Sequence, residues 1–295
     1  MLLPSTPGSS QPPVSLYIPS FNVAQYLDRC IEGVFGQTHR PDEILVVNDG
    51  STDETSAVTA RHPEVRIVNH RTNKGLGASR NTGFAEARNE LVASLDADCV
   101  AAPNWLNILV REITSDPTVA FVGGRLDETV FLNTADRWRQ VHMRQHWGDH
   151  RLVNPEFMFG NNNLIRKSVV LTAGGYDEKM RTNGEDADMS RNIRKLGHNF
   201  VYLPDARVGH LRHDTTSSIL TAFWRYWYFG GRAYFGGITI KKMYRNFRKV
   251  HWKQHGWRFL REDWKARRYG LLWVDLLLPF YMSRCDWKLY RASRR

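Results

Sequence analysis

The chain has 295 residues, 42% of them hydrophobic and 24% charged, which is enough apolar material for one large domain or a domain with an appendage. No stretch reaches the roughly 18 uninterrupted apolar residues of a membrane-spanning helix. Residues 1–12 lack the basic start and apolar centre of a signal peptide, so we predict a loose tail there. The three cysteines (Cys30, Cys99 and Cys285) have no metal-binding or redox spacing, and their odd number argues against a disulfide framework. A reducing, cytoplasmic setting is expected.

The positive charge is concentrated at one end of the chain. Residues 225–295 contain 18 Lys and Arg against 4 Asp and Glu, whereas the preceding residues contain 23 against 26. This asymmetry predicts an appendage with a partner of its own, either an anionic membrane surface or nucleic acid. We expect a first domain over 13–215 and a helical, basic, aromatic-rich C-terminal region over 216–295.

Short apolar strands alternate with helical segments through the first two thirds of the chain. Asn22 is a plausible N-cap for a helix whose apolar face includes Leu27 and Ile31. Strands that alternate with helices predict right-handed crossovers and a mixed but mostly parallel sheet, which is an α/β fold. The expected strands are Val14–Ile18, Glu43–Val47, Val65–Val68, a run from Leu91 to Asp96, Val119–Val122 and Phe200–Leu203.

Polar segments follow three of these strands directly. They are Pro19–Asn22, Asn48–Ser51 and Asp96–Asp98. Each alone could be an ordinary turn, but the carboxyl ends of parallel strands share one edge of a sheet, so all three would converge on one crevice. The paired carboxylates suit a divalent cation, and a cation suits a phosphorylated substrate. The glycines of Gly75-Leu76-Gly77 satisfy neither the P-loop nor the dinucleotide fingerprint, which leaves a nucleotide site of another kind.

Two further groups of titratable residues lie later in the chain. Glu185 and Asp186 precede residues at helical spacing and so occupy the first turn of a helix. Acids there either stabilise the helix electrostatically, by roughly 0.3–1 kcal/mol, or supply a general base. His210 and His213 are too few for a zinc site, and His210 is either a metal ligand or a packed or capping histidine.

Taken together, these motifs resemble the family 2 glycosyltransferases, inverting enzymes that use nucleotide sugars and have the GT-A fold. The resemblance covers about residues 13–212. It rests on seven pieces in the same order: residues 18–22, 47–53, 73–81, Asp96-Ala97-Asp98, Gly160-Asn161-Asn162, residues 174–178, and Gly184-Glu185-Asp186 followed by Arg191 and Gly197.

The resemblance implies a role for each matching residue. Pro19, Phe21, Asn22 and Asp49 would hold the nucleotide, with Asn48 as a less certain contact, and Arg80 would approach the base or diphosphate. Asp98 would ligate Mn²⁺ or Mg²⁺ directly, Asp96 would contact the ribose or metal-bound water, and some related enzymes add a histidine at a position near His210. Asp186 would be the catalytic base, with Glu185 beside it at the acceptor mouth. The donor would be a nucleoside-diphosphate sugar, most often a UDP-sugar.

The acceptor implied by the resemblance is a carbohydrate or a lipid-linked glycan in the synthesis of cell-surface polysaccharide or glycoconjugate. An apolar stripe over Ile219–Tyr228 is expected to pack partly on the first domain. Beyond it, five tryptophans among many Lys and Arg suit an anionic membrane interface, and a solvated basic subdomain is the alternative. The protein is therefore expected in the cytoplasm, with peripheral association at the inner face of the cell membrane.

Two other functions are weighed against this one. A sugar-nucleotide nucleotidyltransferase would need a Gly- and Lys/Arg-rich loop after the first strand, where this chain has Pro19-Ser20-Phe21-Asn22. A non-catalytic nucleic-acid-binding protein that uses the basic C-terminal region would leave the acidic motifs unexplained. No nucleic-acid partner is therefore expected.

Overall fold

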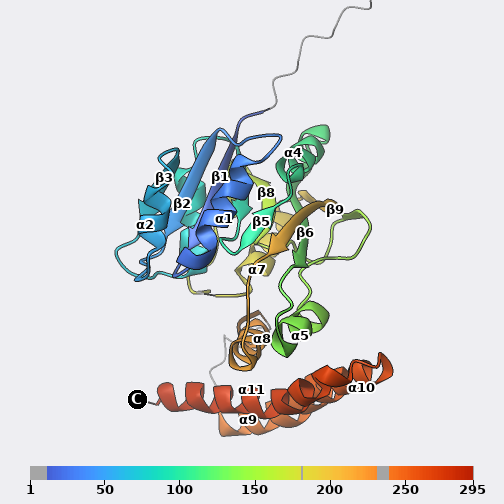
Figure 1. Ribbon diagram of the computed structural model, residues 1–295. Helices are drawn as coiled ribbons and strands as arrows, with labels where there is room; N and C mark the ends of the chain where they lie inside the picture. The colour runs from blue at the N-terminus through green and yellow to red at the C-terminus, as the bar shows by residue number, and fades with distance from the viewer. Residues whose placement is uncertain (1–11, 181, 231–238, 295) are drawn as a thin grey trace, which may run out of the picture.

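The structure is a computed structural model that describes residues 12–180, 182–230 and 239–294. A nine-stranded sheet is flanked by helices, and further helices form a separate layer below it (Figure 1). The strands are β1 (Val14–Ser20), β2 (Glu43–Asn48), β3 (Val65–Asn69), β4 (Leu91–Leu95), β5 (Cys99–Ala101), β6 (Val119–Glu128), β7 (Leu152–Val153), β8 (Asn162–Arg166) and β9 (Asn199–His210).

The helices of the sheet region alternate with these strands as the sequence predicts. They are α1 (Ala24–Phe35), α2 (Thr55–Ala60), α3 (Leu76–Glu86), α4 (Trp105–Ser115), α5 (Thr134–His142), α6 (Lys167–Thr172) and α7 (Glu185–Lys195). The later helices are α8 (Thr216–Gly230), α9 (Ile240–Asn246), the π-helix η2 (Phe247–Gly256), α10 (Trp257–Lys265), the 3₁₀-helix η3 (Tyr269–Leu271) and α11 (Leu272–Ala292).

The sheet has the order β3-β2-β1-β4-β8-β6-β9-β5, with β7 paired to β9. The four strands β1 to β4 are parallel, so the segments after β1, β2 and β4 meet at one edge, as expected. The antiparallel pairings involve β5, β7 and β8, short strands that the apolar pattern did not predict. β8 lies between β4 and β6 and carries the Asn162-Asn163 pair of the Gly-Asn-Asn-Asn motif into the sheet.

One local prediction is wrong. Asn22 is not the N-cap of α1, because Val23 occupies that position and Asn22 has a φ of 53°. The left-handed conformation, which Asn tolerates better than most residues, turns the Asn22 side chain toward the next loop. There its Oδ1 accepts a hydrogen bond from the Thr52 backbone N–H at 2.8 Å. The residue joins two loops instead of capping a helix.

Apolar side chains fill both faces of the sheet. On one face Leu16 and Ile18 of β1 pack with Ile31 of α1 and Trp105 of α4. On the opposite face Tyr17 packs with residues of α3, α6 and α7. Burial on both faces explains why β1, β2 and β4 read as continuous apolar runs without polar alternation.

A third core joins α5 to α8, α10 and α11. Trp138 of α5 packs edge-on against Phe223 of α8 and Phe259 of α10, and Val274 and Met282 of α11 belong to the same cluster. The apolar stripe of α8 is buried here, as expected. Helix α5, which precedes residue 215, thus shares a core with the helices after that residue. The division into domains at 13–215 and 216–295 remains a prediction.

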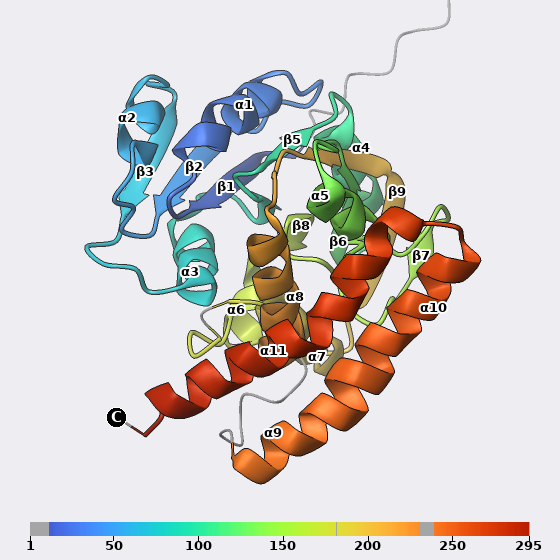
Figure 2. The ribbon, with the colours of Figure 1, turned by 60° about the horizontal axis from the view of Figure 1, so that its bottom comes forward.

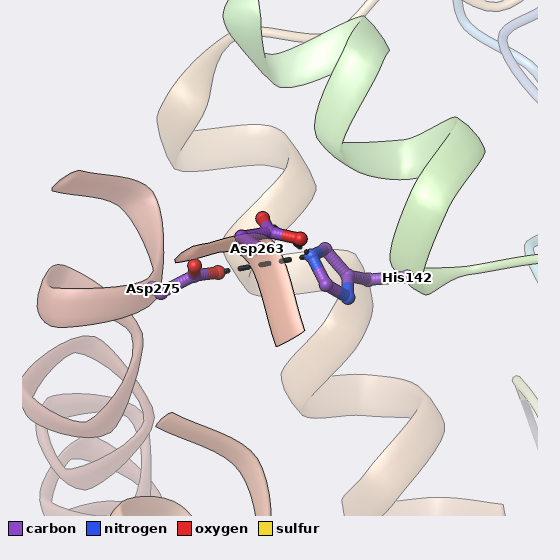
Figure 3. Close-up of side chains that lie close together, drawn as sticks. All are labelled: His142, Asp263 and Asp275. Atoms are coloured by element: carbon purple, nitrogen blue, oxygen red, sulfur yellow. Dashed lines mark hydrogen bonds and ion pairs between the residues drawn. The ribbon is translucent and has the colours of Figure 1, made fainter. Parts of the chain in front are cut away.

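A buried polar cluster ties this third core together (Figure 3). His142 Nε2 lies 3.0 Å from Asp263 Oδ2 and 3.8 Å from Asp275 Oδ1. Trp138 Nε1 donates to Asp275 Oδ1 at 2.8 Å, and Arg268 Nη2 pairs with Asp263 Oδ1 at 2.7 Å. The two carboxylates thus connect α5 to α10 and α11. Arg268 supplies a positive charge beside them that does not depend on pH.

The cluster should make the stability of the protein depend on pH. Burial, and to a smaller extent the Asp263 carboxylate, raises the pKa of Asp275 to about 7 although the Trp138 hydrogen bond opposes the shift. The folded protein therefore keeps this proton up to about pH 7, whereas an unfolded chain releases it near pH 4. Between about pH 4 and pH 7, this group therefore lowers the free energy of unfolding as pH rises, by on the order of 1 kcal/mol per pH unit.

Asp275→Asn isolates that effect, because an amide still accepts from Trp138 and does not titrate. We expect urea unfolding at pH 5 and pH 8 to show wild type losing stability relative to the variant at the higher pH. Asp263→Asn is the contrasting change and should destabilise at both pH values, because it weakens the contacts to Arg268 and His142. Parallel pH profiles for wild type and Asp275→Asn would refute this account.

Candidate active site

A cavity of about 710 Å³ lies between the sheet, α5 and α8. It receives side chains from the ends of β4 and β9, from the start of α7 and from α8. Six of the site residues predicted from the sequence line it: Arg80, Asp96, Asp98, Glu185, Asp186 and His210. The other five do not: Pro19, Phe21, Asn22, Asn48 and Asp49.

Asp98 and His210 meet on one side of the cavity. His210 Nε2 lies 3.3 Å from Asp98 Oδ2, while His210 Nδ1 lies 2.8 Å from Glu128 Oε2. Burial alone would lower the pKa of His210, but Asp98 and Glu128 outweigh it and raise the pKa to about 9. Burial alone would raise the pKa of Asp98, but His210 and Arg212 outweigh it and lower the pKa to about 2.

This pair has the features of a site for a divalent cation. Two ligands of one ion with bonds of about 2.1 Å lie roughly 3 Å apart, and the Asp98–His210 separation is close to that value. Glu128 orients the imidazole from its far side, as carboxylates do for many metal-bound histidines. A carboxylate with an imidazole suits Mn²⁺ better than Mg²⁺, which prefers oxygen ligands alone. The side chains present therefore fit the predicted ion.

A second group of described residues also offers three possible metal ligands. The ligand atoms of His142, Asp263 and Asp275 lie within 4.8 Å of one another. Both carboxylates, however, already accept strong hydrogen bonds from Trp138 and Arg268. Arg268 also supplies a positive charge there, which makes this cluster the poorer cation site of the two.

Arg80 lines the cavity although only 1% of the residue is exposed. Its guanidinium donates to Ser94 Oγ at 2.9 Å and to the Gly160 carbonyl at 2.7 Å. It also pairs with Asp96 and with Glu185, each at 3.3 Å. A Cβ at position 160 would lie 2.6 Å from Arg80 Nη2, so a larger residue there would displace the guanidinium. Arg80 therefore connects the carboxylate after β4 to the first carboxylate of α7.

Glu185 and Asp186 differ in their surroundings although they are neighbours. Glu185 is buried against Arg80, and burial together with Asp186 raises its pKa to about 7. Asp186 is more open, and its carboxylate accepts from the backbone N–H groups of Gly160 and Ala187. Burial raises the pKa of Asp186 despite Arg80 and these two hydrogen bonds. Asp186 is therefore an oriented carboxylate with an increased proton affinity, as a general base requires.

The five predicted residues outside the cavity build the loops at the ends of β1 and β2. Asp49 is buried and accepts from the backbone N–H groups of Lys74 and Gly75, both at 2.8 Å. The Asn48 side chain donates hydrogen bonds to Ser56 and Asn69. Pro19 is buried in β1, and Asn22 joins the two loops.

Phe21 stands out in this group because 45% of it is exposed. An exposed aromatic ring at the carboxyl edge of the sheet is available to stack on a nucleotide base. The loop of Gly75 leads straight into Leu76 and Arg80 at the start of α3, both of which line the cavity. The loops and the cavity are thus parts of one continuous edge.

Several cavity residues were not predicted from the sequence. Arg139 of α5 and Arg212 both bond to the buried carboxylate of Asp214, and both line the cavity. Tyr226 and Trp227 of α8 line it from the opposite layer. The only available signal was the aromatic stripe of α8, which predicts burial without indicating which side chains reach the site. His213 does not line the cavity and bonds to Asp136 instead.

Comparisons with known proteins identify the family of the chain. Residues 15–172 match the family described as Glycosyl transferase family 2. The pre-mycofactocin glycosyltransferase of Mycobacterium tuberculosis is 30% identical over 213 residues, which are 69% of this chain and 43% of that protein. The chondroitin synthase of Escherichia coli is 35% identical over 115 residues, which are 38% of this chain and 17% of that protein. The chain thus spans less than half the length of these relatives.

Solved structures show the same fold at low sequence identity. The mannosyltransferase PcManGT from Pyrobaculum calidifontis, in complex with GDP-Man and Mn²⁺, superposes with a TM-score of 0.57 at 18% identity and covers 96% of this chain and 85% of its own. GalNAc-T7 with UDP, GalNAc and Mn²⁺ also has a TM-score of 0.57, at 20% identity over 75% of this chain and 48% of its own. The predicted GT-A fold is therefore confirmed. With more than half of its length matched by the family, the chain belongs to glycosyl transferase family 2.

Proposed function

We propose that the protein is a metal-dependent, inverting glycosyltransferase that moves a sugar from a nucleoside-diphosphate sugar to an acceptor hydroxyl. The observation that carries the proposal is the single cavity that contains both the Asp98–His210 pair and the oriented carboxylate of Asp186. One end suits a cation and the diphosphate that it would bind, and the other suits proton abstraction. The membership of family 2 supports the same reaction class.

Asp98 and His210 would hold Mn²⁺, with Asp96 as the supporting carboxylate. When bound, the ion supplies positive charge against the negative charge that develops on the departing nucleoside diphosphate. Arg139 and Arg212 line the same cavity and add to that positive potential. The Mn²⁺ ion, Arg139 of α5 and Arg212 would thus place positive charge where the leaving group gains negative charge.

Asp186 would take the proton from the acceptor hydroxyl as its oxygen attacks the anomeric carbon. The hydrogen bonds from Gly160 and Ala187 fix the carboxylate in one orientation, which reduces the entropy lost on reaching the transition state. A single displacement of this kind inverts the configuration at the anomeric carbon. Glu185 would act indirectly, because its contact with Arg80 holds the start of α7 against Asp96.

The loops after β1 and β2 would bind the nucleotide. Phe21 would stack on the base, and Pro19 and Asn22 would shape its pocket, while Asp49 and Asn48 maintain the loops around it. A UDP-sugar is the proposed donor. The two solved relatives contain UDP in one case and GDP-Man in the other, so guanosine is the competing base.

The acceptor is proposed to be a carbohydrate or a lipid-linked glycan, in polysaccharide or glycoconjugate synthesis at the inner face of the cell membrane. The aromatic walls of the cavity, Trp147, Phe159, Tyr226 and Trp227, suit sugar rings. No helix in the described residues has the length and apolarity needed to cross a bilayer. We propose that attachment is peripheral and depends on the basic, aromatic-rich C-terminal helices.

A panel of nucleotide sugars tests the proposal. Each donor is incubated with purified protein in Mn²⁺, in Mg²⁺ and in EDTA, and release of the free nucleotide is measured. We expect one nucleotide class, UDP-sugars first, to be hydrolysed slowly in Mn²⁺, more slowly in Mg²⁺ and not in EDTA. Hydrolysis that proceeds equally well in EDTA would exclude the metal-dependent mechanism, and retention at the anomeric carbon would exclude inversion.

A further inference from the structure

Exposed apolar side chains gather on the C-terminal helices. Eleven large hydrophobic residues are exposed within 239–294, compared with eight in all the other described residues together. They come from α9, η2, α10, η3 and α11: Ile240, Tyr244, Trp252, Trp257, Trp264, Tyr269, Trp273, Leu276, Leu277, Phe280 and Trp287. Such a concentration on a folded domain marks an interaction surface.

The same helices expose an almost purely positive set of charges. Residues 239–294 contain 15 Lys and Arg and four acids. Three of the acids, Asp263, Asp275 and Asp286, are fully buried. The fourth, Glu262, is paired with Arg258 at 4.0 Å. The outer surface therefore combines aromatic and aliphatic side chains with many cations for which the described residues provide no ion pair.

The apolar and charged residues lie on the outer side of the layer. On α11 the exposed residues 273, 276, 277, 280, 284 and 287 recur at helical spacing, while Val274, Leu278 and Met282 face the third core. On η2 the residues His251, His255 and Gly256 are buried, and a Cβ at Gly256 would lie 2.4 Å from Pro279 of α11. Figure 2, which brings this side forward, shows α11 in front of α8 and beside the continuous helical run from α9 to α10.

The π-helix shapes a hollow in this surface. A hollow of about 510 Å³ is lined by Phe247, Arg248, Trp252, Lys253 and Trp257. Phe247, Trp252 and Trp257 are five residues apart, which is the span of a π-helical hydrogen bond, so successive rings follow one another by about one turn, with Arg248 and Lys253 next to the first two. Phe280 of α11 closes one side, with ring centroids 6.2 Å from Trp252 and 5.9 Å from Phe247.

The cations of the hollow are available to a ligand. Arg248 lies over the Tyr244 ring at 5.7 Å, and among the described residues neither Arg248 nor Lys253 has a carboxylate within ion-pair distance. A phosphate would be the natural partner of two such cations, and three aromatic rings beside it suit the glycerol and upper acyl carbons of a lipid. Membrane interfaces favour this combination of Trp rings with Lys and Arg.

We propose that the hollow between Phe247 and Trp257 binds the headgroup of an anionic phospholipid, and that the surrounding face of η2 and α11 lies on the membrane. The inference rests on the peripheral location in the proposed function and not on the transfer chemistry. Exposed aliphatic residues such as Leu276 and Leu277 favour lipid over nucleic acid, because bases stack on aromatic rings but gain little from Leu. The enzyme would thus be held where a lipid-linked acceptor is found.

Vesicle sedimentation with the full-length protein tests this inference. The vesicles are pure phosphatidylcholine or phosphatidylcholine mixed with phosphatidylglycerol, each at low and high salt. We expect wild type to bind the mixed vesicles at low salt, with affinity about tenfold or more above that for pure phosphatidylcholine. Arg248→Gln/Lys253→Gln and Trp252→Ser/Trp257→Ser should each weaken binding by about tenfold or more. Soluble glycerol phosphate lacks the acyl carbons beside the aromatic rings, so it should not displace the protein from the mixed vesicles, and displacement by it would overturn the inference in favour of a site for a soluble phosphate.

Matched variants on the sheet region provide the controls. Arg40→Gln/Arg61→Gln removes two exposed charges, and Leu132→Ser/Leu171→Ser removes two exposed apolar side chains, and neither should alter vesicle binding. Asp186→Asn should bind vesicles like wild type, which separates this inference from the proposed reaction. Unchanged binding by both hollow variants would overturn it. If the protein bound no vesicles but bound a single-stranded oligonucleotide tightly, the inference would be wrong and the surface would be a nucleic-acid site.

Discussion

Asp186→Asn is expected to reduce sugar transfer by about 10²- to 10⁴-fold while leaving Mn²⁺ and donor binding close to wild type. An amide occupies the same volume and keeps one of the two hydrogen bonds, because the N–H groups of Gly160 and Ala187 bond to different oxygens of Asp186 and the amide has a single acceptor oxygen. It cannot take a proton from the acceptor, so only the chemical step should suffer. The rate is measured as nucleotide release from the best donor of the panel, and donor affinity is measured by calorimetry.

Asp188→Asn is the matched control for that experiment. Asp188 lies in the same first turn of α7 but pairs with Arg191 at 2.6 Å and does not line the cavity. It removes the same charge from the helix N-terminus and should change the rate little. If Asp186→Asn keeps near wild-type turnover, or if Asp188→Asn is equally damaging, Asp186 is not the base.

Asp98→Asn should have the second large effect, and on binding rather than on chemistry. Loss of the charged ligand should weaken Mn²⁺-dependent donor binding by about 100-fold or more, because the amide is neutral and a poorer ligand. Glu128→Gln should lower the affinity for Mn²⁺ by about 10- to 100-fold, because Glu128 only orients His210. Titration of the donor by calorimetry in Mn²⁺ and in EDTA measures both variants.

Asp127→Asn serves as the control for these two variants. Asp127 precedes Glu128 in β6 but pairs with Arg125 and Arg207, outside the cavity. Donor binding should therefore remain dependent on Mn²⁺ and close to that of wild type. Strong donor binding by Asp98→Asn in EDTA would show that the nucleotide is held without a cation at this position.

The sequence predicts the parallel half of the sheet well because those strands are buried on both faces. β1, β2 and β4 read as continuous apolar runs, and their polar ends identify the site edge. The sequence does not predict β8 because the strand begins with two asparagines, a residue type that is rare in strands and common in turns. In the fold, Asn162 Oδ1 accepts from Trp105 Nε1 at 2.7 Å, a partner 57 residues away.

The location of Arg80 likewise could not be predicted from sequence. Its partners Asp96 and Glu185 are 16 and 105 residues away, and only the folded chain shows that the guanidinium lies between them. The roof of the cavity is a similar case. Helices α5 and α8 form it because they share the third core, and local spacing gives no indication of which residues of a buried stripe turn toward the sheet.

The position of Mn²⁺ in a crystal grown with UDP and MnCl₂ tests the central claim most directly. An anomalous difference map locates the ion without any assumption about the reaction. The account predicts a peak within coordination distance of both Asp98 and His210, with the diphosphate of UDP on its far side. A peak between His142, Asp263 and Asp275 instead, or UDP bound at the sheet edge with no ion at Asp98, would contradict it.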